Sequence, residues 1–406
     1  MDRDFDLVIV GGGMVGASLA VALSPLPLRV ALVEAFAPDS DAQPSYDDRC
    51  TAISHGSQVI LNTMGVWQDM EADASPITRI HVSEQGRPGI ARIDAREQGV
   101  PALGYVVPNR SVGKALWKRL PAQSNLQSFM PAKLVSMQPG ENAVELDLEQ
   151  ADGQVLSVGA RLVVAVDGAR SITREMAGID SDVLDYQQTA IICNVTPEQG
   201  HQGQAYERFT QSGPLAVLPL GEKRCSVVWT VKRELAESIM GLDDESFLLR
   251  LQEHFGYRLG RLLVAGERSS YPLYRVKARQ QLAQRLVVLG NAAHNLHPVA
   301  GQGFNLSLRD VAALAEVMAS LEGVDPGTPA MLEQYMQWRR EDQDKVLGFT
   351  HGLVRLFTSS LAPVKLARSA GLLSFDLVPG AKKLFARHTM GRAGRLPRLA
   401  RGVPLL

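Results

Sequence analysis

A glycine-rich segment near the start of the chain constrains the fold more than any other part of the sequence. An apolar run of strand length leads directly into G-x-G-x-x-G, with the glycines at Gly11, Gly13 and Gly16. A helical stretch follows, and a second apolar run ends at Glu34. A strand, a glycine turn, a helix and a second strand in this order are typical of the βαβ unit that binds dinucleotides. We therefore predict a doubly wound α/β domain around this segment.

The glycines and the carboxylate have separate expected roles at the nucleotide. Gly11 permits the tight turn, Gly13 lets the backbone approach a pyrophosphate, and Gly16 lets the helix pack closely on the strand. The start of the helix offers backbone N–H groups to the anion, and Glu34 stands where a carboxylate would bind ribose hydroxyls. A glycine-rich turn without a ligand is the plainer alternative. Which dinucleotide binds depends on the rest of the chain.

The composition excludes several functional classes. The 406 residues have room for roughly two to three domains. A formal net charge of −1 gives no general attraction to nucleic acid. Cys50, Cys193 and Cys225 are too few and too scattered for a disulfide framework or a cysteine-ligated zinc site. His294 and His297 have no third ligand nearby in the sequence, so we expect packing around a turn rather than a metal.

The two ends of the sequence bear on localisation. The acidic N-terminus is not typical of a signal peptide, and no apolar run of about 18 residues occurs. We expect a cytoplasmic protein, either soluble or peripheral on the inner face of the cytoplasmic membrane. An apolar helical face at 346–357 precedes the C-terminus, whose charged side chains after Asp376 are all basic. This pattern favours contact with an anionic membrane or a protein partner over a solvated tail. These basic residues are Lys382, Lys383, Arg387, Arg392, Arg395, Arg398 and Arg401.

Hydrophobic patterning divides the chain into two kinds of sheet. The apolar runs 162–166 and 285–289 are typical of strands buried on both faces, and each breaks at glycine, at 167–168 and at 290–291. Between them, from about 184 to 231, a period of two indicates a separate antiparallel sheet. The chain therefore leaves the nucleotide-binding domain, builds a second sheet and returns.

The glycine-bearing breaks favour FAD over NAD. Ligands of doubly wound sheets bind outside the carboxyl ends of the strands. Three such ends, at 11–16, 167–168 and 290–291, are spread over most of the chain. They would hold one long cofactor that reaches across the sheet from its adenine to a distant flavin.

The same segments resemble motifs of the group A flavoprotein aromatic monooxygenases. Residues 167–174 look like D-G-x-x-S-x-x-R, residues 290–294 resemble G-D-A-A-H, and residues 297–305 resemble H-P-x-x-G-Q-G-x-N. Within that family, the stretches 206–219 and 224–229 are similar to the ubiquinone-biosynthesis hydroxylases. The resemblance extends from residue 5 to about 345.

This resemblance implies a Rossmann-like FAD-binding domain of the p-hydroxybenzoate hydroxylase type, with an inserted antiparallel-sheet substrate domain and a helical C-terminal region. The expected boundaries are 1–75, 100–182 and 276–345 for the FAD-binding domain, 76–99 and 183–275 for the substrate domain, and 346–406 for the helical, basic region.

The resemblance also implies a set of FAD-binding residues. Asn291 stands where the wider family has Asp; the amide keeps an acceptor oxygen and loses the charge, and the ubiquinone-biosynthesis subgroup also carries Asn. A helix from about Phe304 would direct its N–H groups and dipole at the N1/C2 edge of the flavin. The implied set is Gly11, Gly13, Gly16, Glu34, Arg49, Asn109, Asp167, Gly168, Asn291, Gly301, Gln302, Gly303 and Asn305.

Fewer residues are expected at the substrate. Arg208 reads equally well as a substrate clamp or as a solvated strand residue. No acid or base is assigned. We expect Asp310 on the polar side of its helix, and Ser171 as a helix cap. The expected substrate residues are the flavin-proximal His297 and Pro298 and the pocket residues Arg208, Phe209, Leu218 and Pro219.

The function implied by the resemblance is hydroxylation of a polyprenyl phenol in ubiquinone biosynthesis. NAD(P)H or an equivalent donor reduces FAD, O2 forms a C4a-hydroperoxide, and its terminal oxygen attacks the ring, converting 2-polyprenyl-6-methoxyphenol to the 1,4-benzoquinol. The alternatives are another ring position, another hydrophobic aromatic, or a flavin-bearing scaffold subunit of a biosynthetic complex. A flavin halogenase is disfavoured because residues 229–231 do not begin W-x-W-x-I-P. The expected partners are the hydrophobic phenol, a ubiquinone-biosynthesis complex and the membrane surface, but not nucleic acid.

Overall fold

A parallel sheet forms around the glycine-rich segment. The computed structural model describes residues 4–37, 49–321, 323–358 and 378–406, with residues 361, 363, 364, 367, 368, 370, 371 and 374. The strands of this sheet are β1 (Phe5–Val10), β2 (Val30–Val33), β8 (Leu126–Phe129), β11 (Val155–Ala165), β18 (Leu282–Ala283) and β19 (Leu286–Val288). Their order is β18–β19–β11–β1–β2–β8; consecutive strands from β19 to β8 in this order are parallel, and β18 pairs antiparallel with β19. The central strand β1 is buried along its whole length. The predicted Rossmann-like parallel sheet is confirmed, but it is not doubly wound, because helices cover one of its faces and an antiparallel meander covers the other.

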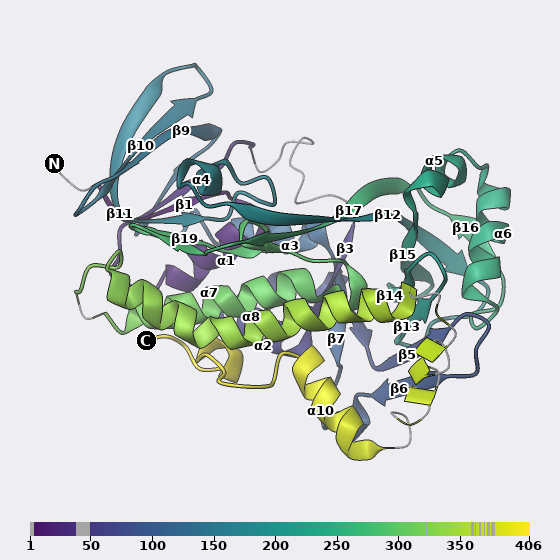
Figure 1. The fold of residues 1–406 in the computed structure, drawn as a ribbon. Coiled ribbons are helices and arrows are strands. Elements are labelled where there is room, and N and C mark those ends of the chain that lie inside the picture. The colour runs from purple at the N-terminus through teal and green to yellow at the C-terminus, as the bar shows by residue number, and fades with distance from the viewer. Residues whose placement is uncertain are drawn as a thin grey trace.

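The two faces of the parallel sheet are covered differently. Helices pack on one face, where the core contains Leu7 and Ile9 of β1. A meander of two strands extends antiparallel from β11, and the core on that face contains Val8 and Val10. Figure 1 shows the helices below the sheet and the meander above it. The helices are α1 (Met14–Leu23), α2 (His55–Thr63), α3 (Asn109–Trp117), α7 (Gln302–Ala319) and α8 (Pro329–Thr358), and the meander strands are β9 (Ala132–Pro139) and β10 (Val144–Gln150).

The second sheet is antiparallel except at one pair. Its strands are β5 (Arg79–Glu84), β6 (Ile90–Asp94), β12 (Ser181–Pro197), β13 (Gln204–Phe209), β14 (Pro214–Leu220), β15 (Arg224–Lys232), β16 (Leu262–Ala265), β17 (Ser269–Ala278) and β20 (His294–Asn295). The order is β20–β17–β12–β15–β14–β13–β5–β6, with β16 beside β12, and β13 runs parallel to β5. Helices α5 (Arg233–Met240) and α6 (Asp244–Phe255) lie at the outer end of this sheet (Figure 1). The predicted second sheet is confirmed, and β5 and β6 form a hairpin within it.

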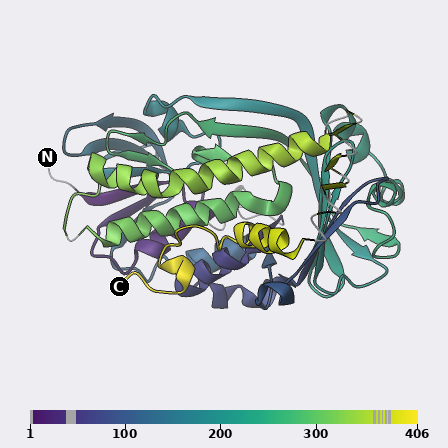
Figure 2. The ribbon, with the colours of Figure 1, turned by 60° about the horizontal axis from the view of Figure 1, so that its bottom comes forward.

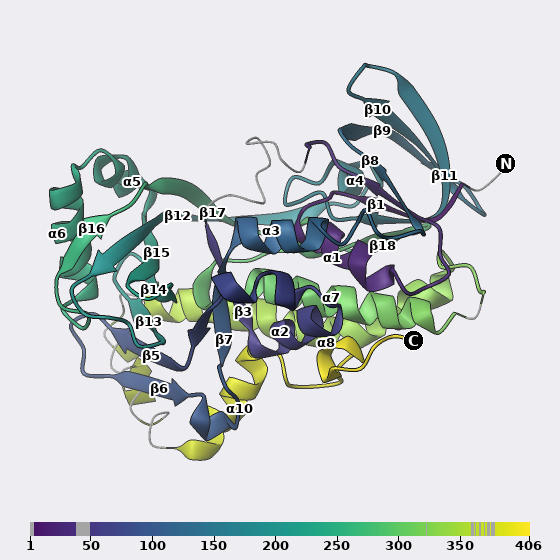
Figure 3. The ribbon, with the colours of Figure 1, turned by 180° about the vertical axis from the view of Figure 1, so that it is seen from behind.

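A small third sheet lies between the two larger ones (Figure 3). It contains β3 (Cys50–Ser54), β7 (Gly104–Pro108) and β4 (Ser75–Ile77), in the order β3–β7–β4. Short 3₁₀ helices η1 (Trp67–Asp69), η2 (Glu71–Asp73) and η3 (Arg96–Gln98) lie in the connections around it. This sheet matters for the site because β3 lies directly beside the start of α7.

The C-terminal region crosses the molecule and returns. Figure 2 shows α8 beside α7, with its far end at the second sheet, where Phe357 stacks on Phe209 of β13 at 3.6 Å between ring centroids. Helix α10 (Pro379–Thr389) and η6 (Leu399–Arg401) follow, and Leu399 and Leu405 are buried in the main core. The predicted helical region 346–406 is described only in part. Across the described part of the chain, we find no helix with the length and apolarity needed to cross a bilayer.

Candidate functional site

The first glycine turn leaves no room for side chains. Gly11 has φ +110°, and a Cβ there would lie 2.6 Å from the carbonyl oxygen of Val166. A Cβ on Gly16 would lie 1.8 Å from the carbonyl oxygen of Gly11. Gly13 is the N-cap of α1, so the free N–H groups of the helix begin directly after it. This geometry suits the approach of a pyrophosphate to the backbone.

Glu34 is held against this turn. One carboxylate oxygen accepts a hydrogen bond from the N–H of Gly12 at 2.5 Å, and the other accepts from the N–H of Phe36 at 3.0 Å. The side chain follows β2 directly and is buried. The carboxylate therefore lies beside the glycines, as the motif predicts, and it also fixes the turn. A contact between Glu34 and a ribose stays a prediction.

The loop after β11 is organised by Asp167. Its carboxylate accepts hydrogen bonds from the hydroxyls of Ser171 and Thr173 and from the N–H of Thr173. Ser171 accepts from the N–H of Arg174 at 2.9 Å and caps α4 (Ile172–Met176), which confirms the predicted cap. Gly168 adopts φ +90° next to the carboxylate. Asp167 thus shapes the loop through its own hydrogen bonds.

Arg174 joins this loop to the third motif. Its guanidinium donates to the carbonyl of Ala292 at 2.8 Å, within η4 (Gly290–Ala292). Gly290 has φ +61°, and a Cβ there would meet Val15 of α1 at 3.3 Å. Asn291, between them, is exposed. The loops after β1, β11 and β19 are therefore adjacent, as the sequence predicts for one extended cofactor site.

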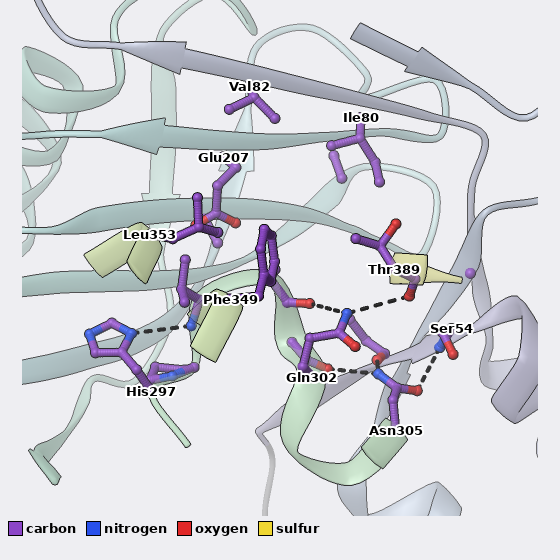
Figure 4. Close-up of a pocket in the computed structure, with 18 of the residues that line it drawn as sticks. Ser54, Ile80, Val82, Glu207, His297, Gln302, Asn305, Phe349, Leu353 and Thr389 are labelled. Atoms are coloured by element: carbon purple, nitrogen blue, oxygen red, sulfur yellow. Dashed lines mark hydrogen bonds between the residues drawn. The ribbon is translucent and has the colours of Figure 1, made fainter. Parts of the chain in front are cut away.

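A second helix N-terminus follows in the third motif. Ala300 and Gly301 both adopt left-handed conformations, at φ +59° and +58°, at the end of η5 (Val299–Gly301). Gly301 is the N-cap of α7, whose eighteen residues point their positive end at this loop. The amide of Gln302 donates to the carbonyls of Ala300 and Thr389 (Figure 4). We call residues 297–303 the flavin loop, because the resemblance leads us to expect them at the flavin.

Asn305 fixes the flavin loop to β3. Its side-chain oxygen accepts from the N–H of Ser54 at 2.8 Å, and its amide donates to the carbonyls of Ala52 and Gly301 at 2.8 and 2.7 Å (Figure 4). With these bonds made, Asn305 positions backbone groups rather than offering its own amide to a ligand.

Arg49 and Asn109 lie together at the start of β3. The N–H of Asn109 donates to the carbonyl of Arg49 at 2.8 Å, and the Thr51 hydroxyl donates to the Asn109 side chain at 2.7 Å. The Arg49 guanidinium lies over the ring of Tyr271, 4.7 Å from its centroid. The structure therefore brings this predicted pair together, and it adds Thr51, which the sequence motifs do not mark.

A cavity of about 770 Å³ lies between the flavin loop, the second sheet and the C-terminal helices. Most of its described wall is apolar. It contains the predicted residues Phe209, Leu218, Asn291, His297, Pro298, Gly301, Gln302, Gly303 and Asn305. The remaining predicted FAD residues lie at the ends of the parallel strands or at the start of β3 and α3.

Two predicted pocket residues are not in the cavity wall. Along β13 successive side chains point to opposite faces of the sheet, so Phe209 and Arg208 cannot both face the cavity. The Arg208 side chain instead donates to the carbonyl of His254 at the end of α6, at 2.8 Å. Pro219 likewise follows Leu218 on β14 and does not line the cavity. The clamp role expected of Arg208 therefore has no support in this geometry.

Two titratable groups stand out in the cavity wall. Burial lowers the pKa of His297 to about 4, and its Nδ1 accepts from the N–H of Val299 at 3.2 Å, so the ring is neutral at physiological pH. Burial raises the pKa of Glu207, on β13, to about 7. Sequence reasoning did not select Glu207. Its spacing of two from Phe209 was the available signal, because residues two apart share a face of a strand.

A buried polar cluster connects His294, which precedes the flavin loop, to α7 and α8. Asp310 of α7 is fully buried, which corrects the expectation that it lies on the polar side of the helix. It accepts hydrogen bonds from His294 at 3.0 Å, Arg339 at 2.6 Å and Gln343 at 3.1 Å. Desolvation alone would raise the pKa of Asp310, but Arg339 and His294 outweigh it and lower the pKa to about 2. His294 therefore anchors α7 through Asp310. In the residues the structure describes, no group of three or more His, Cys, Asp or Glu is arranged to hold a metal ion.

These features fit an extended dinucleotide. Gly11 and Gly16 form a cradle that a side chain would fill, two helix N-termini face the loops, and the apolar cavity adjoins the second helix N-terminus. A pyrophosphate suits the first helix and an electron-accepting ring suits the second. The donor set thus matches FAD.

Comparisons with known proteins give a consistent result. The model of a family described as "FAD binding domain" matches residues 4–350. Ubiquinone hydroxylase UbiL of Rhodospirillum rubrum is 41% identical over 100% of this chain and 94% of its own length. The 3-demethoxyubiquinol 3-hydroxylase of Escherichia coli is 31% identical over 95% of this chain and 98% of its own length. The crystal structure of p-nitrophenol 4-monooxygenase PnpA from Pseudomonas putida superposes with a TM-score of 0.80, covering 98% of this chain and 100% of that one, at 18% identity, which indicates a shared fold.

Proposed function

Because this chain belongs to the FAD binding domain family, and within it to the ubiquinone-biosynthesis hydroxylases, we propose that it hydroxylates the aromatic ring of a polyprenyl phenol. The protein is an FAD-dependent monooxygenase. The observation that carries the substrate proposal is the apolar cavity of about 770 Å³ beside the flavin loop. A cavity of this size and lining suits a hydrophobic aromatic better than a small polar acid.

The residues of the chain bind and orient the cofactor and the substrate, and they exclude water from the site. Bound FAD, with NAD(P)H as electron donor and O2 as co-substrate, supplies the oxygen chemistry. The glycine turn and α1 would hold the adenine end of FAD, and the positive end of α7 would stabilise negative charge on the reduced ring. The apolar wall keeps water from the reacting centre. None of these roles requires a metal ligand from the protein.

The cavity wall offers surface for a prenyl chain. Apolar side chains reach it from the hairpin of β5 and β6 and from α8, as Figure 4 shows for Ile80, Val82 and Leu353. Apolar side chains of α10 also line it, so the space extends away from the flavin loop. The prenyl part of the substrate would lie along this extension, and the phenol ring would lie nearest the flavin loop. The residues concerned are Ile80, Val82, Ile93, Phe349, Leu353, Leu356, Phe385 and Met390.

The ring position is the finer part of the proposal. We favour conversion of 2-polyprenyl-6-methoxyphenol to the 1,4-benzoquinol, and the name of the Escherichia coli relative supports a second position as the alternative. The deciding measurement is the quinone precursor that accumulates when the gene is removed. Accumulation of 2-polyprenyl-6-methoxyphenol supports our choice, and accumulation of a demethoxy quinol supports the alternative. Unchanged ubiquinone content would contradict both.

Turnover is tested on the purified protein. We expect bound FAD, its reduction by NAD(P)H, and a hydroxylated product from a prenylated phenol. Reduction without product from any prenylated phenol would instead favour a scaffold subunit that carries flavin.

We also propose that α10 contacts an anionic membrane surface. Lys383, Leu384 and Arg387 are exposed together on this helix, which also lines the cavity from its inner side. Deleting the C-terminus is a poor test, because Leu399 and Leu405 belong to the core. A better test is the double variant Lys383→Glu with Arg387→Glu in flotation with phosphatidylglycerol vesicles.

The matched control for the membrane test is Lys114→Glu with Lys133→Glu, which changes exposed charges on α3 and β9 instead. Each basic residue near such a surface contributes about 1 kcal/mol, so the α10 variant should bind at least about tenfold more weakly than the control. Equal flotation of the two variants would remove the membrane contact.

A further inference from the structure

Glu207 is a carboxyl group on the wall of an apolar cavity. It lies on β13 between Ala205 and Phe209, whose side chains share its face of the strand. Its direct cross-strand neighbours are Val82 on β5 and Ala216 on β14. Its surroundings are therefore apolar on both sides, and the carboxyl group faces the cavity rather than bulk water.

No residue in the described part of the chain makes a hydrogen bond or ion pair with the Glu207 carboxyl group. The other carboxylates near the site all have partners. Glu34 accepts from two backbone N–H groups, Asp310 is paired with Arg339, and Glu84 on β5 is paired with Arg368. An ionised carboxylate on the wall of an apolar cavity is costly without a partner, and such groups are retained where a ligand supplies the partner.

Glu207 and the flavin loop line the cavity from different elements. Glu207 projects from the second sheet, whereas Gln302 and Asn305 come from the start of α7 (Figure 4). If the aromatic ring of the substrate lies between these two walls, one side of the ring is turned toward the flavin loop and the other toward the sheet. Its hydroxyl group would then need a polar partner on the sheet side.

We propose that Glu207 accepts the proton of the substrate's phenolic hydroxyl and thereby activates the ring for hydroxylation. This inference rests on the proposed function, because it takes a phenol as the substrate. It places Glu207 in contact with the substrate, as a catalytic residue.

The proton balance of the step is closed. The phenol O–H bond breaks, its electron pair stays on oxygen, and the proton moves to a Glu207 carboxylate oxygen. The negative oxygen raises electron density at the ortho and para carbons, where one atom of O2 forms the new C–O bond. The other oxygen atom leaves as water, with electrons from NAD(P)H. The attacked carbon then loses its proton to the departing oxygen atom, which completes the water molecule, the ring regains aromaticity, and Glu207 returns its proton to the phenolate.

The acidity of Glu207 is suited to this task. Burial raises its pKa to about 7, and a general base works best when its pKa lies near the working pH. The other titratable groups in the described wall are Cys50, Tyr206, His297 and Arg368. His297 is neutral in this range, and Arg368 is paired with Glu84. Tyr206 precedes Glu207 on β13, so its side chain points to the other face of the sheet, where its ring packs against Phe255, and burial raises its pKa. His297, Arg368 and Tyr206 therefore do not replace Glu207 as the acceptor.

The test compares wild-type holoenzyme with Glu207→Gln and Glu207→Asp, using 2-prenyl-6-methoxyphenol as the probe. Glutamine keeps the shape and cannot take a proton, so hydroxylation should fall by about 10²- to 10³-fold. The wild-type rate should rise with pH through about 7, and the glutamine variant should lack that rise. Aspartate keeps a carboxylate and should restore part of the rate together with the rise.

A stability measurement gives a readout that does not depend on turnover. The folded-state pKa of Glu207 is raised above its usual 4.5, so its contribution to stability is full below pH 4.5 and is lost as pH rises through about 7. Glu207→Gln removes that loss. Its melting temperature should therefore exceed that of wild type at pH 8, and the gain should shrink toward pH 5.

The outcomes separate this inference from the proposed function. If wild type hydroxylates the probe and Glu207→Gln retains its rate and pH profile, the inference fails and the function stands. If wild type hydroxylates no prenylated phenol, the function fails, and the inference fails with it. If Glu207→Gln does not retain FAD, the decision rests on Glu207→Asp. A rate and pH rise in that variant support the inference, and a pH-independent rate overturns it.

Discussion

Arg174 donates a hydrogen bond over 2.8 Å to the carbonyl of Ala292, and this bond joins the loop after β11 to the loop after β19. The guanidinium is almost fully buried and also donates to the carbonyl of Ala169 at 3.3 Å. The two motifs that lie 118 residues apart are therefore one structural unit. This unit lies close to the first glycine turn, because a Cβ added at Gly290 would lie only 3.3 Å from the Val15 side chain at the start of α1.

Replacing Arg174 should loosen this unit. Arg174→Leu removes both donors and leaves the Ala292 carbonyl buried without its charged partner, which we expect to cost about 2 kcal/mol of unfolding free energy. FAD content should fall as well, because the loops would no longer be held together. The matched control is Arg170→Leu, which changes an exposed arginine of the same motif. Equal melting temperature and flavin-to-protein absorbance ratio in the two variants would contradict the role of Arg174.

The glycine cradle predicts a sharp steric effect. Gly16→Ala places a Cβ 1.8 Å from the carbonyl oxygen of Gly11, so α1 must move away from β1. Overpacking of this kind costs about 1–3 kcal/mol or more, and the displaced helix should no longer retain FAD. Gly348→Ala is the control, because Gly348 is an exposed position in α8 with open space around it. That control should keep FAD and be slightly more stable. Full flavin content in Gly16→Ala would refute the cradle.

Local signals predicted much of the fold. The apolar runs of β1, β11 and β19 identified buried parallel strands, because they are short, rich in valine and bounded by glycine breaks. The cap at Ser171 was predicted because capping depends only on residues within one turn. The order of the glycine breaks along the chain was also enough to indicate one extended cofactor site.

Features that depend on distant partners were not predicted. Asp310 is charged and sits at a helical position, so nothing local indicates that Arg339 and His294, 29 and 16 residues away, enclose it. Glu207 was missed for a related reason. Its exposure to the cavity depends on the pairing of β13 with β5, whose residues lie more than a hundred positions earlier. Arg208, the next residue of β13, lies on the opposite face because side chains alternate along a strand.

The buried cluster behind the flavin loop predicts a large stability effect. Asp310→Ala leaves the Arg339 charge without its closest partner in the core, which typically costs about 3–5 kcal/mol. Asp344→Ala is the control, because it removes an exposed carboxylate of α8 that pairs with Lys277 on the surface. That change should have little effect, since exposed pairs contribute little. Denaturant unfolding that gives equal midpoints for the two variants would show that the cluster is not a structural anchor.

His297 predicts a pH-dependent contribution to stability. Its folded-state pKa of about 4 lies below the usual 6.5, so the unfolded state binds the extra proton between these values. Stability from this residue is therefore full above pH 6.5 and declines toward pH 4, by up to about 3 kcal/mol. His297→Asn keeps an acceptor for the N–H of Val299 and cannot titrate. Because Glu207 changes stability in the opposite direction over part of this range, the measurement is the wild-type minus variant difference in unfolding free energy. That difference should rise from pH 4 to pH 6.5; a constant value would mean that the imidazole is not buried in its neutral form.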